Sequence, residues 1–140
     1  MKKGFSLIEV TVSLSILAVL VYMASSSFLA LAPKYRLQKC VWEINSRLNF
    51  AKHKAIFEGV NVRIKFNSTG YQIEIYDQDE KKWNLEEKHF LEGVKIEANN
   101  SPAFYPQGTV SNLASIYISN SWGKYKITIA ITGRIKIVRL

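Results

Sequence analysis

This chain of 140 residues has a single cysteine, Cys40, so no disulfide can form within it. It has only two histidines, which lie far apart and form no zinc-ligand pattern with that cysteine. The sequence motifs of a nucleophile elbow, a phosphate-binding loop and a dinucleotide-binding fold are missing as well. The fold must therefore rest on packing, and the sequence predicts no enzyme, no metal site and no cofactor.

Acidic residues are absent from the last third of the chain, where none follows Glu97. That stretch carries five cations, which are Lys124, Lys126, Arg134, Lys136 and Arg139. A stretch of one charge sign suits a polyanionic partner such as DNA or acidic lipid. It equally suits the solvated face of an ordinary basic protein, and composition alone leaves both interpretations open.

Helix-breaking residues are also missing near the start, because no Gly or Pro lies between Gly4 and Pro33. Residues 5–32 form an apolar run that is interrupted only by Glu9 and by scattered hydroxyl residues. As a helix this run would be about 42 Å long, which is more than the roughly 30 Å of a bilayer's hydrocarbon core. The pattern predicts a membrane helix over residues 5–32.

One explanation of this segment is an ordinary secretory signal. Lys2 and Lys3 would be its basic start, and Ala30-Leu31-Ala32 would be its cleavage site. The apolar run is too long for such a signal, however, and it carries a carboxylate. Pro33 would also follow the cut directly, which is a poor context for that peptidase.

Glu9 favours another explanation, because a carboxylate in a membrane helix costs about 2–3 kcal/mol and therefore marks function. The segment Lys2-Lys3-Gly4-Phe5-Ser6-Leu7-Ile8-Glu9 resembles the type III signal of prepilins. The resemblance implies that a prepilin peptidase removes the leader, residues 1–4, after Gly4 and that Phe5 is then methylated. It also implies that Glu9 neutralises the N-terminal amine of a neighbouring subunit during assembly.

The remaining sequence predicts one soluble domain over residues 33–140. The helix is expected to continue past Pro33 to about Glu58, with an apolar stripe at alternating steps of four and three residues. The stripe comprises Leu37, Val41, Ile44, Leu48, Ala51 and Ala55. From Val60 onward the period falls to two, which predicts strands. The expected strands are 61–66, 71–76, 88–91, 94–98, 115–119, 125–132 and 134–138.

The C-terminal part resembles the GspH/FimT family of minor pseudopilins. The resemblance rests on Phe104-Tyr-Pro-Gln-Gly108, two alternating strands and Thr132-Gly-Arg-Ile-Lys-Ile137. It implies an α+β fold in which a long N-terminal helix, with a membrane half and an amphipathic half, packs on an antiparallel sheet or sandwich. It further implies a minor pilin or pseudopilin near the tip of a type IV pilus-like or type II secretion filament.

The resemblance also identifies partners and a location. The expected partners are other pilins or pseudopilins and the prepilin peptidase. The chain is expected to cross the inner membrane once, with its C-terminal domain outside the cytoplasm, before it enters a filament.

DNA binding for natural transformation is the alternative function. Some members of the resembled family bind DNA through a C-terminal Gly-Arg-x-Arg sequence, which here is Gly133-Arg134-Ile135-Lys136. Lys136 keeps the charge of the second Arg but lacks its bidentate geometry. Lys124, Lys126 and Arg139 complete the candidate DNA-binding set, because phosphate contacts need only positive charge.

Overall fold

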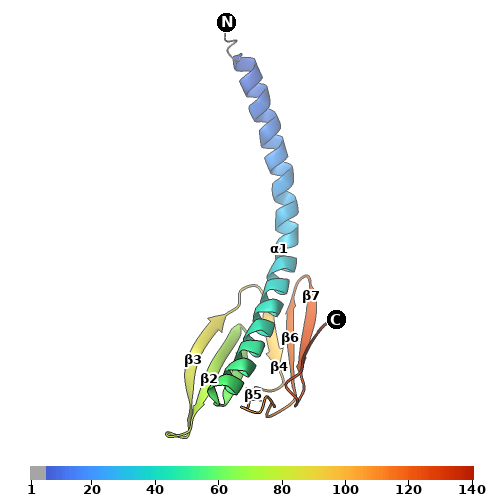
Figure 1. The fold of residues 1–140 in the computed structure, drawn as a ribbon. Coiled ribbons are helices and arrows are strands. Elements are labelled where there is room, and N and C mark those ends of the chain that lie inside the picture. The colour runs from blue at the N-terminus through green and yellow to red at the C-terminus, as the bar shows by residue number, and fades with distance from the viewer. Residues whose placement is uncertain (1–5) are drawn as a thin grey trace. The chain divides into compact units, whose positions relative to one another are not determined.

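The computed structural model describes residues 6–140, and the side chains of all of these except Ser26, Ser27 and Leu29. The chain forms two compact units, Met1–Ala32 and Pro33–Leu140. Helix α1 (Leu7–Glu58) runs through both units and contains Pro33, as the sequence predicts (Figure 1).

In the first unit α1 is apolar, and every side chain from Leu7 to Ser25 is exposed. This segment is long and apolar enough to cross a membrane. Its hydroxyl groups are satisfied locally, because Ser13 Oγ and Ser15 Oγ each donate to a backbone carbonyl four residues earlier, at 2.8 Å. Hydroxyl side chains bonded in this way are tolerated in an apolar helix.

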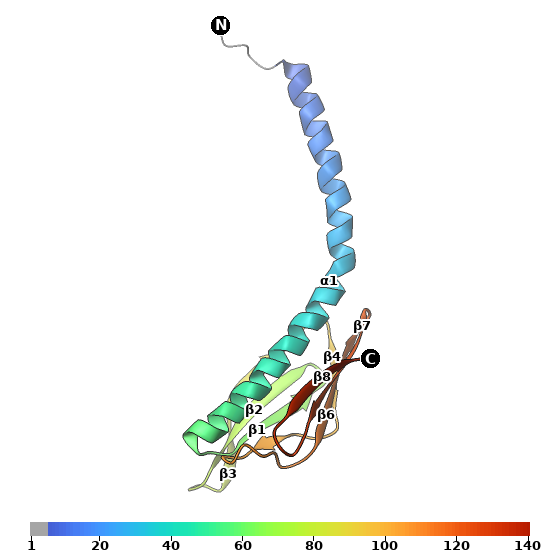
Figure 2. The same ribbon diagram turned by 45° about the vertical axis from the view of Figure 1, so that its right-hand side comes forward.

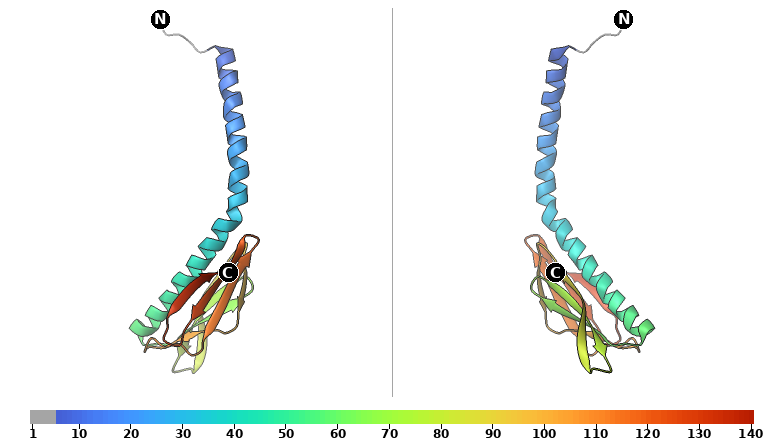
Figure 3. Two further views of the ribbon diagram at one scale, coloured as in Figure 1. Left: turned by 90° about the vertical axis from the view of Figure 1, so that its right-hand side faces the viewer. Right: turned by 90° about the vertical axis from the view of Figure 1, so that its left-hand side faces the viewer.

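In the second unit one face of α1 is buried. The predicted stripe is confirmed, since each of its six residues is at most 3% exposed; they are Leu37, Val41, Ile44, Leu48, Ala51 and Ala55. Both sheets lie on the same side of this part of the helix, as Figure 3 shows. The stripe therefore forms the helical half of the core.

The strands form two antiparallel sheets (Figures 1 and 2). The first sheet has the order β3-β2-β1-β5, and the second has the order β4-β6-β7-β8. The first comprises β1 (Val62–Asn67), β2 (Gly70–Asp77), β3 (Lys82–Phe90) and β5 (Ala103–Phe104). The second comprises β4 (Lys95–Ala98), β6 (Ala114–Asn120), β7 (Gly123–Ile129) and β8 (Ile135–Arg139). The predicted α+β fold is confirmed.

Alternate residues of both sheets face the helix and complete the core. From the first sheet these include Val62, Ile64, Ile73 and Phe104, and from the second Ile116, Ile118, Ile127 and Ile129, all fully buried. This is the alternation that a sheet with one buried face requires.

Two predicted strand boundaries are wrong. The sequence placed a strand at 88–91, whereas β3 begins at Lys82. Residues 82–87 lack a clear alternation because β3 is an edge strand with no buried side chain, held by its pairing with β2. The other strand was predicted to run to Thr132, but β7 ends at Ile129, because a turn closed by a bond from Gly133 N to Ala130 O (2.9 Å) follows it.

Candidate functional site

Glu9, the predicted assembly residue, lies in the first turn of α1 with its side chain exposed. The backbone amides of Glu9 and Val10 both bond to the carbonyl of Ser6, at 3.0 and 3.2 Å. A carboxylate in a first turn is favoured by the helix dipole. Gly4 and Phe5 lie outside the described residues, so cleavage and methylation stay predictions.

A second stripe on α1, which the sequence analysis missed, lies on the side of the helix about opposite the buried stripe. It consists of the exposed aromatic residues Tyr35, Trp42, Phe50 and Phe57. Steps of seven, eight and seven residues keep these rings on one side of a helix, about opposite the buried stripe. We call this surface the aromatic face. The same spacing argument that found the buried stripe could have found it. One of its members, Trp42, also lines a surface hollow with Tyr125 and Ile137 of the second sheet.

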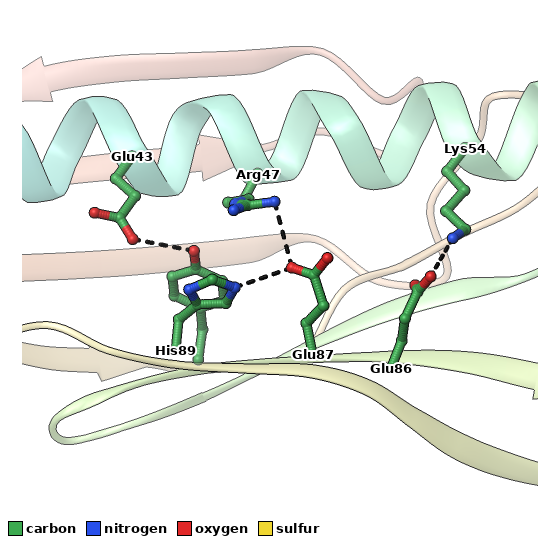
Figure 4. A network of polar contacts seen from close by, with 7 residues as sticks. Glu43, Arg47, Lys54, Glu86, Glu87 and His89 are labelled. Carbon is green, nitrogen blue, oxygen red and sulfur yellow. Dashed lines mark hydrogen bonds and ion pairs between the residues drawn. The ribbon is translucent and has the colours of Figure 1, made fainter.

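A polar layer joins α1 to the first sheet (Figure 4). Arg47 pairs with Glu87 at 3.3 Å, and Glu87 also accepts a hydrogen bond from His89 at 2.9 Å. Lys54 forms an ion pair with Glu86. Because His89 and Arg47 stabilise its charged form, the pKa of the Glu87 carboxyl is lowered. These contacts hold the helix against the edge strand β3.

Tyr71 lies beneath this layer, with its side chain buried, and its hydroxyl donates to Glu43 at 3.2 Å. Burial and the nearby Glu43 carboxylate raise the pKa of Tyr71 to about 12. The phenol is therefore protonated at neutral pH and serves as a structural donor. In the described part of the chain, every buried side-chain polar atom has a hydrogen-bond partner. Within that same part, no three His, Cys, Asp or Glu side chains gather closely enough to hold a metal ion.

The predicted DNA-binding cations lie in and beside the second sheet. Lys124 and Lys126 alternate along β7, and Lys136 on β8 is paired with Thr128. These three side chains therefore share the outer face of the sheet, away from the core. Lys124 Nζ and Lys126 Nζ lie 4.6 and 5.4 Å from the ring centre of Tyr117 on β6. We call this surface the basic face.

Arg134 lies beside the basic face, just before β8 begins. Arg134 and Lys136 line one surface hollow of about 350 Å³. Its other lining residues are Leu113, Thr128, Ile129 and Ala130. Four of the five predicted cations are thus on or next to one surface, which combines positive charge with an apolar floor.

Arg139 is separate from that group. It follows Ile135 and Ile137 in the alternation of β8, so it faces the opposite side of the sheet from Lys136. Its guanidinium carbon lies 4.2 Å from the ring centre of Trp122. A DNA-binding role for the five cations stays a prediction, and Arg139 would contribute to it from the other face of the sheet, as the alternation of β8 indicates.

Two glycines of the C-terminal motifs meet in the structure. Gly133 has a φ of +73°, and a Cβ atom there would overlap with the carbonyl oxygen of Gly108. Lys52 Nζ on α1 donates to the carbonyl of Gly133 at 3.1 Å. The contact joins the β7–β8 turn to both the helix and the loop that contains Gly108. It also gives a packing reason for glycine at position 133, whereas Gly108 is favoured by its own φ of +81°.

Comparison with known proteins finds a sequence motif at the N-terminus and a similar fold among solved structures. Residues 1–25 match the family model of the prokaryotic N-terminal methylation motif. A solved structure of the minor pseudopilin EpsH from the type 2 secretion system of Vibrio cholerae has a TM-score of 0.65 at 13% identity, covering 74% of this chain and 97% of its own. A second EpsH structure from Vibrio cholerae has a TM-score of 0.63 at 12% identity, covering 74% of this chain and 93% of its own. No curated protein matches this chain in sequence.

These findings confirm the predicted methylation motif at the N-terminus and the pilin-like fold of the chain. At 12–13% identity the structural similarity concerns the fold alone.

Proposed function

We propose that this chain is a minor pseudopilin, a structural subunit of a type II secretion or type IV pilus-like filament, positioned near the filament tip. A prepilin peptidase cuts it after Gly4 and methylates Phe5. Helix α1 then holds it in the inner membrane, with residues 33–140 outside the cytoplasm, until other pseudopilins take it up.

The uncovered apolar surface of α1 is the observation that supports this proposal most. Every side chain from Leu7 to Ser25 is exposed, and the second unit exposes the aromatic face as well. Exposed apolar surface of this extent indicates a binding partner or a membrane. Lipid covers the first segment before assembly, and helices of neighbouring subunits cover both segments afterwards.

The direct test is mass spectrometry of the chain purified from filaments sheared off the cells. We expect a mature N-terminus at Phe5, with one methyl group on its amine. A leader still attached in assembled filaments would contradict the proposal. So would a mature chain beginning at Pro33, which would instead support the secretory-signal explanation.

Glu9→Ala should uncouple assembly from processing. Cleavage should continue, because the cut lies several residues away. Incorporation into filaments should fall roughly tenfold or more, because the neighbour's N-terminal amine loses its partner and an unpaired charge in the membrane costs about 2–3 kcal/mol. The measurement is the ratio of filament-bound to membrane-bound chain on immunoblots. Ser13→Ala, which removes a hydroxyl from the same segment but no charge, should leave this ratio unchanged; an equal ratio for Glu9→Ala would show that the ion pair is dispensable.

DNA capture is the second candidate function, and it is favoured by the placement of Lys124, Lys126, Arg134 and Lys136 on and beside the basic face. We expect the full chain in detergent to bind duplex DNA weakly, without sequence preference, and less tightly as salt rises. Arg134→Gln/Lys136→Gln should weaken binding and lower the salt slope by roughly one unit per lost phosphate contact. Fluorescence anisotropy across a salt series measures both quantities. Absence of binding at low salt would exclude this function.

The control for this experiment must remove equal charge elsewhere. Arg63 and Lys65 are unsuitable, because they hold the buried Glu74 carboxylate, with Arg63 Nε and Lys65 Nζ at 2.8 and 2.9 Å from its oxygens. Lys82→Gln/Lys88→Gln changes two exposed positions on β3 instead. If both double variants lose binding equally, the effect reflects net charge and the basic face is not a DNA site.

A further inference from the structure

We propose that the soluble unit binds the headgroups of anionic phospholipids at the end where the chain enters it. We call this end the headgroup end and define it by residues 33–36, 93–95 and 119–122 together with Arg139. The inference rests on the proposed function in one respect, namely that Leu7–Ser25 spans a membrane.

The headgroup end is a built structure. Asn120, at the end of β6, donates from Nδ2 to the carbonyl of Pro33 at 2.7 Å. The same Asn120 accepts a hydrogen bond from the backbone of Trp122 at 2.9 Å through Oδ1. This side chain thus fixes the β6–β7 turn to the helix at the first residue of the unit, and Figure 1 shows the tip of that turn beside the helix.

Trp122 lies close to two cations at this end. The guanidinium carbon of Arg139 lies 4.2 Å from the ring centre, and Lys34 Nζ lies 5.5 Å from it. An indole flanked by Lys and Arg is the combination that proteins place at the interface between membrane and water. The aromatic ring suits the boundary of the acyl chains, and the cations suit phosphate.

A polar hollow of about 500 Å³ lies at the same end. Arg36 and Lys95 are its cations, and its other lining residues are Pro33, Gly93, Val94, Ser119, Asn120 and Ser121. A Cβ atom on Gly93, whose φ is +73°, would press on Cδ of Arg36 at 3.2 Å. Two cations beside serine hydroxyl groups can bind a phosphate diester.

The charges facing this end are mainly positive. Lys95 is paired with Glu97 at 2.6 Å, whereas Lys34, Arg36 and Arg139 have no ion pair with an acid among the described residues. Glu43 and Glu92 line a second hollow that also involves Arg36, together with the cation Lys39. The surplus of cations therefore favours anionic over zwitterionic lipid.

Chain connectivity brings this end close to a bilayer. The candidate span Leu7–Ser25 lies within the apolar run of residues 5–32, and Pro33, the first residue of the second unit, follows that run in the same helix α1. The helix from Ser25 to Pro33 rises about 12 Å, more than the roughly 5–8 Å of one headgroup layer, but it exposes the apolar Phe28 and Leu31, which suit the hydrocarbon. The cations at the headgroup end can therefore reach lipid phosphates while Leu7–Ser25 is still in the membrane.

The test uses the full chain in lipid nanodiscs and the fluorescence of Trp122. Trp42→Phe/Trp83→Phe leaves this residue as the only tryptophan. A lipid with a nitroxide on its headgroup quenches tryptophan at short range. We expect clearly stronger quenching of Trp122 in discs of phosphatidylcholine with 30% phosphatidylglycerol than in pure phosphatidylcholine, and the difference should shrink with added salt.

Trp83 provides a matched control, because it too has a stacked arginine, with Arg63 4.1 Å from its ring centre. It lies at the β2–β3 turn, at the other end of the unit from the β6–β7 turn (Figure 1). The variant that keeps only Trp83 should therefore show no dependence on anionic lipid. If anionic lipid increased the quenching of Trp83 and Trp122 equally, the proposal of a local site at the headgroup end would be wrong.

A charge-matched pair of variants tests the hollow itself. In the Trp122-only chain, Arg36→Gln/Lys95→Gln should weaken binding of the soluble unit to the headgroups. The ratio of quenched to unquenched Trp122 should fall roughly 10- to 25-fold, at about fivefold per cation. Lys126→Gln/Lys136→Gln, which removes the same charge from the basic face, should leave the ratio unchanged. Equal effects of the two double variants would show that lipid binding depends on net charge and not on a site at the headgroup end.

Two other results overturn the proposal in distinguishable ways. If the chain enters nanodiscs but Trp122 responds equally to both lipids, the headgroup site fails and membrane anchoring stands. If the chain does not enter nanodiscs at all, the proposed membrane-held precursor fails as well.

Discussion

Gly4→Leu is expected to leave the leader on essentially every copy of the chain. The prepilin signal has a residue without a side chain at the position before the cut, so a branched side chain there should prevent the peptide from fitting the peptidase. Uncut chains should stay in the membrane and be missing from filaments, because the amine that would be methylated never forms. Immunoblots that resolve the leader-bearing and mature chains measure this directly.

Gly4→Ala is the control for that experiment, since one methyl group is the smallest change available and should be tolerated. Normal cleavage of Gly4→Leu would show that the peptidase does not read this position. Filaments that contain uncut Gly4→Leu chains would show that assembly does not require processing. They would leave the specificity of the peptidase for Gly4 unchallenged.

Gly133→Ala should destabilise the soluble unit by about 3 kcal/mol or more. A residue with a Cβ atom in the left-handed region costs about 1–2 kcal/mol, and forcing an atom into a packed contact costs about 1–3 kcal/mol more. Here that atom overlaps with the carbonyl oxygen of Gly108, and the same turn is bonded to Lys52. Such a loss is a large share of the 5–15 kcal/mol that typically stabilises a domain.

Gly59→Ala separates these two contributions. Gly59 has a similar φ of +68°, but a Cβ atom there would meet nothing within 4 Å. It should therefore cost only about 1–2 kcal/mol. Urea unfolding of the full chain in detergent, followed by tryptophan fluorescence, gives both values. Equal losses would mean that Gly133 is needed for its backbone angle alone and that its contact with Gly108 carries no energy.

Local sequence patterns predicted the elements whose side chains face one core. The alternation of three and four located the buried stripe of α1, and the alternation of two located the β1–β2 hairpin, because both periods record which side is buried. The first half of β3 was missed because none of its side chains is buried, so it shows no clear alternation. This strand is held by its pairing with β2, and that pairing depends on the residues of β2 as much as on those of β3.

The division into two sheets was not readable from the sequence for a similar reason. β4 follows β3 in the chain but pairs with β6, and β5 pairs with β1 across more than 30 residues of sequence. Such choices are set by tertiary packing rather than by the local period. The polar layer likewise joins residues of α1 to residues of β2 and β3 that no local pattern connects.

The candidate sites also differ in whether a local sequence pattern or only the folded chain reveals them. Glu9 was found because a charge in an apolar run is conspicuous by itself. The basic face followed from charge and alternation together, whereas the headgroup end depends on Asn120 meeting Pro33, 87 residues away. Lys34, Trp122 and Arg139 come from three separate segments, so only the folded chain shows that they share one end.

The core contacts between α1 and the second sheet join residues that are far apart in the sequence, and this has a consequence for synthesis. A nascent chain emerges N-terminus first, so the buried stripe of α1 leaves the ribosome before any strand that covers it. Ile127 and Ile129 of β7 arrive more than 70 residues after Ala55, and β8 closes the sheet only at residues 135–139. Contacts of such separation form slowly, and uncovered apolar surface promotes aggregation meanwhile. The stripe is thus the first part of the core to be synthesised and the last to be covered, so a ribosome that stalls before residue 135 leaves the core unfinished.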